Sequence, residues 1–212
     1  VLFGMLEPIV HEVVAPNGGS FHAKLWALRY VDPSGVKDPC LRIVVLTRNL
    51  TFDRSWDLSL LLDGTLRKGK RRANRALERF VRALPGMSVR EVSKEAQARA
   101  NLLADELLRT DFELPENFDE VSFNVHGLGG RRWRPSDSDE LAVISPFCND
   151  TALRELAESS KNPVALVSRS EELDALSTET LDLFSSVRVL EETAETEDGE
   201  DTTESASTLR GL

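Results

Sequence analysis

The chain of 212 residues is 41% apolar, which is enough for one large domain or two small ones with cores of their own. No run approaches the roughly 20 apolar residues that a membrane-spanning helix needs, so no such helix is predicted. Two cysteines, Cys40 and Cys148, are too few for a disulfide framework. A reducing, cytoplasmic location is the simplest expectation.

The net charge of −10 is concentrated at one end of the chain. Residues 191–212 contain eight acidic residues and one arginine, and so carry −7 of it. The other 190 residues carry only −3, so the overall acidity says little about what they bind. Because Glu, Asp, Thr and Ser dominate the segment 191–212, we expect it to be acidic and flexible.

The first part of the chain is predicted to contain strands followed by two helices. Alternating apolar residues and turn residues predict strands at 8–14, 20–31, 41–46 and 56–62, the last closed by Asp63 and Gly64. Apolar residues at helical spacing predict helices at 70–84, stopped by Pro85, and at 88–109, with Ser88 as a candidate N-cap. A further short strand is expected at 121–125.

A second pattern begins after an expected linker at 127–138. Strands at 141–144, 164–167 and 187–190 alternate with helices at 150–159 and 171–184. Alternation of this kind predicts a parallel sheet with right-handed crossovers. Because the opening residues 1–5 resemble the inside of a domain, we expect the chain to be a fragment with sequence missing before Val1.

A histidine and a lysine stand two positions apart in the expected strand at 20–31. Residues two apart on a strand share a face, so His22 and Lys24 present an imidazole and an ammonium about 6–7 Å from each other. An imidazole can attack phosphorus, and an ammonium can neutralise a phosphoryl oxygen. Asn49 follows the next strand and Asp57 begins the one after. Taken alone, however, a His-x-Lys pair is typical of an ordinary strand that faces water.

Together these residues resemble the half-site of the phospholipase D superfamily. That half-site has His-x-Lys on one strand, Ser-x-Asn at the end of the next and an acidic residue on a third. The matching runs, all within residues 8–63, are Phe-His-Ala-Lys-Leu-Trp, Val-Val-Leu-Thr-Arg-Asn-Leu-Thr and Ser-Trp-Asp-Leu. The resemblance implies an α/β fold with a mixed sheet flanked by helices. Residues 1–126 would be the later part of a first repeat with a two-helix insertion, and 139–190 the start of a second.

The resemblance also implies a role for each of these residues. His22 would form a phosphohistidine or protonate the leaving group, Lys24 and Asn49 would hold the phosphate, and Asp57 would orient His22. The activity implied is that of a metal-independent phosphodiesterase, a hydrolase that needs no cofactor. Arg29 stands where many members carry an aspartate. The tyrosyl-DNA phosphodiesterase branch of the superfamily also lacks that aspartate. That departure favours nucleic acid over lipid as the substrate.

One His-x-Lys pair is only half of such a site, because the family places two histidines across a pseudo-two-fold axis. We expect the second half from residues after Leu212 or from a second copy of the chain in a homodimer. Two alternatives stay open. One is a non-catalytic module that binds phosphate or nucleic acid, and the other is a phospholipid hydrolase.

Two further features could contribute to binding. Basic residues are dense from Arg67 to Arg79 and could follow a nucleic-acid backbone, although a solvated helix face is an equally simple interpretation. His126 could line the same cleft as His22, but a structural role is favoured.

Overall fold

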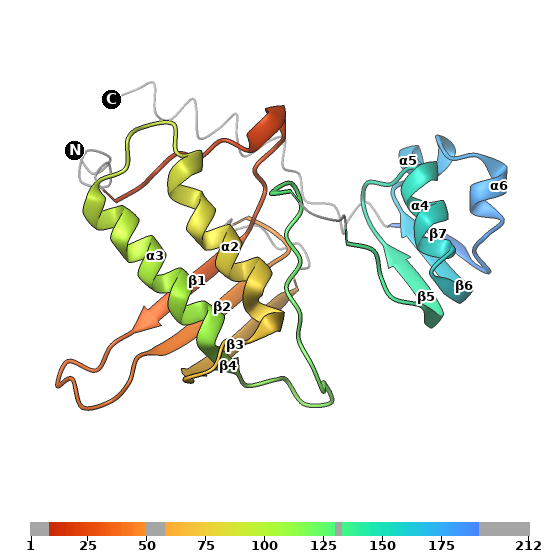
Figure 1. Ribbon diagram of the computed structural model, residues 1–212. Coiled ribbons are helices and arrows are strands. Elements are labelled where there is room, and N and C mark those ends of the chain that lie inside the picture. Colours follow the sequence, from red (N-terminus) through yellow and green to blue (C-terminus); the bar gives the residue numbers. More distant parts are fainter. Residues whose placement is uncertain (1–8, 50–57, 130–132, 191–212) are drawn as a thin grey trace, which may run out of the picture. The chain divides into compact units, whose positions relative to one another are not determined.

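The computed structural model describes residues 9–49, 58–129 and 133–190 (Figure 1). Within these residues the chain divides into two units, one ending at Trp133 and the other beginning at Arg134. The division falls inside the segment 127–138 that we expected to be a linker. Each unit has a sheet and helices of its own, so the predicted α/β class is confirmed.

The sheet of the first unit is antiparallel throughout, and its order follows the sequence. Its strands are β1 (Leu25–Tyr30), β2 (Cys40–Leu46), β3 (Ser59–Leu66) and β4 (Thr110–Phe112). Leu41 and Ile43 of β2 are fully buried. As expected from its apolar run, β2 is an interior strand.

Two helices cover one face of this sheet (Figure 1). They are α2 (Arg75–Ala83), which follows a 3-10 turn at Arg72–Asn74, and α3 (Lys94–Arg109). Leu77, Phe80 and Val81 of α2 pack with Ala104 and Leu107 of α3. These side chains form one core with the buried residues of β2, since all face the space between sheet and helices.

The third strand extends beyond its expected end. Instead of closing at Asp63 and Gly64, β3 continues to Leu66 and pairs with β4, a strand that the sequence did not predict. A Cβ on Gly64 would clash with Thr110 and would lie 2.8 Å from Phe112 Cδ1. The glycine therefore allows β4 to approach closely, and here it is a strand residue rather than a turn residue.

Three other expectations in this unit are wrong. α3 begins at Lys94, and its cap is Ser93, whose hydroxyl accepts a hydrogen bond from Ala96 N at 3.1 Å. Ser88 instead forms an isolated antiparallel bridge with Val13, which is all that the structure shows of the strand expected at 8–14. Residues 121–125 adopt no regular strand.

The second unit has the predicted alternation and a parallel sheet in the order β5-β6-β7. Its elements are β5 (Ser138–Ile144), α4 (Asp150–Ala157), β6 (Ser160–Ser168), α5 (Ser170–Asp174), α6 (Thr178–Leu181) and β7 (Val187–Val189). Leu153 and Leu166 are the most buried residues of its core.

The single helix expected at 171–184 is two short helices. Between them, the backbone amide and hydroxyl of Ser177 donate to Asp150 Oδ1 of α4, at 3.2 and 2.6 Å. The Ser177 hydroxyl lowers the pKa of Asp150. This amide is thus committed to another element, which is consistent with the interruption of the helix.

The structure contains no helix, within its described residues, that is long and apolar enough to span a bilayer.

Candidate functional site

His22 and Lys24 lie just before β1, where the chain is already extended. The carbonyl oxygen of Lys24 accepts a hydrogen bond from Leu46 N of β2 at 3.0 Å, so the strand pairing continues to this residue. Lys24 Nζ lies 3.0 Å from His22 Nδ1 and 2.8 Å from His22 Nε2. His22 is exposed and Lys24 is partly buried. The structure therefore brings the imidazole and the ammonium into direct contact.

Both side chains line a cavity of about 640 Å³ in the first unit. One wall consists of residues between Ala15 and Leu25 together with the ends of β2 and β3, and Leu77 and Phe80 of α2 contribute to another. The irregular segment 121–128 completes the lining. A cavity of this size can hold a small ligand or one or two nucleotides.

The segment 121–128 brings a second histidine to this cavity. His126 is part of the lining and is exposed, as are Ser122 and Asn124. Phe123, Val125 and Leu128 pack against the core, and the Phe123 and Phe112 rings lie 5.8 Å apart, edge to face. A purely structural role for His126 was favoured from the sequence, but the structure places it at the cavity.

Asn49 is not among the described residues that line the cavity with this pair, and it is exposed. Asp57 lies outside the described residues. Thr47, at the position of the family's serine, accepts a hydrogen bond from Leu58 N at 2.9 Å and thus joins the end of β2 to the start of β3. The roles implied for Asn49 and Asp57 stay predictions.

Arg29 makes an ion pair with the covering helix and is absent from the described lining of the candidate site. Its Nε and Nη2 atoms donate to the two carboxylate oxygens of Glu106 on α3, at 2.6 and 2.9 Å. The Glu106 side chain is only 5% exposed. The residue that replaces the family's aspartate therefore ties β1 to the covering helix.

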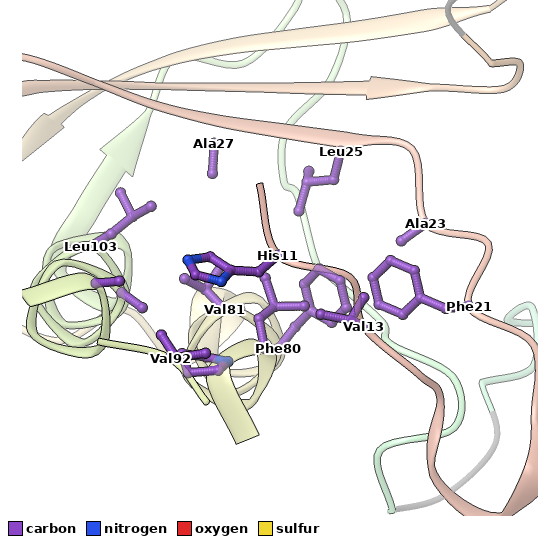
Figure 2. Close-up of a pocket in the computed structure, with 14 residues that line it drawn as sticks. His11, Val13, Phe21, Ala23, Leu25, Ala27, Phe80, Val81, Val92 and Leu103 are labelled. Carbon is purple, nitrogen blue, oxygen red and sulfur yellow. The ribbon is translucent and has the colours of Figure 1, made fainter. Parts of the chain in front are cut away.

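A second cavity, of about 430 Å³, lies between β1 and the helices, and its lining is almost entirely apolar. Figure 2 shows His11 beside Phe21, Ala23, Leu25 and Ala27, which line it from one side of the strand. These are the residues that alternation assigned to one face of the strand. No hydrogen bond or ion pair to another described residue involves the His11 side chain. It serves below as the matched control for His22.

The described residues contain no group of three or more His, Cys, Asp or Glu side chains placed to hold a metal ion. Comparisons with protein-family models, with curated proteins and with solved structures give no match to this chain. The functional argument therefore depends on the geometry of the cavity and on the sequence motif.

Proposed function

We propose that the protein is a metal-independent phosphodiesterase of the phospholipase D type, acting on nucleic acid through a phosphohistidine at His22. The supporting observation is the contact between Lys24 Nζ and both ring nitrogens of His22 beside a cavity of about 640 Å³. A nucleophile and a phosphate-binding cation must lie within reach of one phosphorus atom. This pair meets that requirement.

The contact also suggests how substrate frees the nucleophile. A neutral imidazole has one ring nitrogen with a lone pair, and an ammonium this close to the ring competes with phosphorus for it. A phosphoryl oxygen is a charged acceptor and binds an ammonium more strongly than a neutral ring nitrogen does. In the proposed complex, Lys24 therefore turns to the phosphate and releases the ring nitrogen of His22.

The reaction takes two steps. In the first, a ring nitrogen of His22 attacks phosphorus, a P–N bond forms, and the P–O bond to the leaving group breaks. The leaving oxygen takes a proton from a second imidazole. In the second step, water attacks phosphorus, gives a proton to the same second imidazole, and the P–N bond breaks.

The second imidazole is part of the proposal. The superfamily resemblance assigns it to a second half-site, which a second copy of the chain or a further part of the protein would supply. His126 is the other histidine among the described residues that line the cavity. It is the candidate within this chain for the same proton transfer.

Removing metal ions is the direct test of the proposed class of mechanism. Hydrolysis of bis(p-nitrophenyl) phosphate and of a labelled oligonucleotide should continue at an unchanged rate in excess EDTA, because imidazole and ammonium replace the metal as nucleophile and charge partner. The measurement is the initial rate before and after dialysis against EDTA.

A strict requirement for a divalent ion would contradict this mechanism. Complete absence of hydrolysis, with oligonucleotide binding retained, would instead favour the non-catalytic phosphate-binding module. Hydrolysis of phosphatidylcholine vesicles without hydrolysis of oligonucleotides would favour the phospholipid hydrolase.

A further inference from the structure

Basic side chains gather on the face of α2 that points away from the core. Arg72, Arg75, Arg79 and Arg82 are spaced so that they share one helix face, whereas Leu77 lies on the opposite, buried face. Together with Lys70 and Arg71, these residues line a polar hollow of about 410 Å³. We refer to this set of six residues as the basic face.

The acidic side chains that line the hollow already form ion pairs with an arginine. Glu78 Oε1 and Asp105 Oδ1 each accept a hydrogen bond from Arg82, both at 2.6 Å. Arg71 is paired with Asp111 at 2.8 Å. Among the described residues, no hydrogen bond or ion pair involves the side chains of Lys70, Arg72, Arg75 or Arg79. Within the described part of the chain, four exposed cations therefore stand together without an acidic partner.

This arrangement is unfavourable for the helix itself. Arg72, Arg75 and Arg79 repel one another at spacings of three and four residues, and they lie in or near the first turn of α2. The positive end of the helix dipole is at that turn. Asn74, at the N-cap position, makes no side-chain capping hydrogen bond, and its amide nitrogen donates to the carbonyl oxygens of Leu107 and Thr110, both at 2.8 Å. An anion bound at the hollow would reduce both the repulsion among the arginines and their unfavourable interaction with the helix dipole.

We propose that the basic face binds the phosphate backbone of a nucleic-acid strand. The hollow suits a polyanion rather than a membrane surface, because Leu108 is the single apolar side chain among its described lining residues. Four unpaired cations can contact several phosphates at once, without reading bases. That the polyanion is a nucleic acid rests on the proposed function of the cavity. Binding to the basic face can still be measured without hydrolysis of the bound strand.

One helix connects the basic face with the candidate active site. Leu77 and Phe80 of α2 line the cavity that contains His22, and Arg75 and Arg79 line the hollow. A helix with its side chains is about 10–12 Å across. A strand held on the basic face would therefore need to cross only the width of α2 to reach the cavity.

The test compares two triple variants of equal charge in the 212-residue chain. Arg72→Gln/Arg75→Gln/Arg79→Gln removes three charges from the basic face, and Lys37→Gln/Lys94→Gln/Arg99→Gln removes three exposed charges elsewhere on the same unit. Binding of a fluorescent single-stranded oligonucleotide is followed by anisotropy between 50 and 200 mM salt. The basic-face variant should bind at least about tenfold more weakly, and its slope of log K against log salt should be shallower by about two.

Stability separates loss of the site from loss of the fold. The basic-face variant should melt at the same temperature as the wild type or higher, since repulsion within α2 is removed. The control variant should keep wild-type binding. Unchanged affinity and slope in the basic-face variant, an equal loss in the control, or stronger binding to anionic lipid vesicles than to the oligonucleotide would overturn the proposal.

Failure of the proposed binding at the basic face can be distinguished from failure of the proposed phosphodiesterase activity. His22→Asn should keep oligonucleotide binding while it loses hydrolysis. The basic-face variant should hydrolyse bis(p-nitrophenyl) phosphate at the wild-type rate, because that small substrate does not reach the basic face. A wild-type chain that binds oligonucleotide through the basic face but hydrolyses nothing would refute the phosphodiesterase and leave the binding surface standing.

Discussion

Replacing His22 by asparagine is expected to reduce phosphodiester hydrolysis by at least about 10⁴-fold, because no other group would form the P–N bond. The change should have little effect on folding, since His22 is exposed and its side-chain contact is with Lys24, also a surface-accessible residue. The measurement is kcat on bis(p-nitrophenyl) phosphate, with circular dichroism to confirm the fold.

His11→Asn is the matched control for this change. His11 lies in the same unit but lines the other, apolar cavity (Figure 2). Its replacement should leave kcat unchanged. A His22→Asn protein that keeps more than a small fraction of the wild-type rate, or a His11→Asn protein that loses as much, would show that the nucleophile has been placed wrongly.

Replacing Arg29 by methionine is expected to destabilise the first unit by about 2–3 kcal/mol. Breaking a buried ion pair costs about 3–5 kcal/mol, because the remaining charge has neither water nor partner. The Glu106 carboxylate is buried in this way, because its side chain is only 5% exposed. The Arg29 side chain is 31% exposed, so water will partly take the place of its guanidinium and reduce the cost. Urea denaturation followed by circular dichroism measures the change in the free energy of unfolding.

The double variant Arg29→Met/Glu106→Leu tests whether the lost stability comes from an unpaired buried carboxylate or from a loss of packing. Both ionic groups are then replaced by apolar ones of similar size, so most of the lost stability should return. If the double variant is less stable than Arg29→Met, the cost comes from packing between β1 and α3 rather than from the buried carboxylate.

Sequence patterns predicted those strands and helices that depend on residues close together in the sequence. Alternation predicted an extended strand at 20–31, and the residues on one side of it, from Phe21 to Ala27, line the apolar cavity under the helices. Strand-helix alternation after residue 138 predicted the parallel sheet of the second unit. The contact between His22 and Lys24 follows from their spacing in an extended chain.

Expectations failed where a partner distant in the sequence decides the structure. β4 is only three residues long, and it forms because Gly64 lets it approach β3. Ser88 is used for a bridge to Val13, which leaves the cap of α3 to Ser93. Neither partner can be recognised from a window around the residue itself.

The same limit applies to the candidate site. His126 lies more than a hundred residues after His22, so nothing local placed both at one cavity. The strand-end position of Asn49 suggested a phosphate contact, and this stays a prediction, since Asn49 is exposed and is not among the described residues that line the cavity. The position of a residue just after a strand does not fix where its side chain points.

The central claim is that His22 carries phosphorus during turnover, and mapping the covalent intermediate tests it most directly. Reactions with a labelled oligonucleotide are stopped in alkaline denaturant at successive times, and the digested protein is analysed by mass spectrometry. We expect a nucleotidyl group on the peptide that contains His22, stable to alkali and lost in acid, and none on the His22→Asn protein. An adduct on another residue, or hydrolysis at every time without an adduct on His22, would contradict the claim.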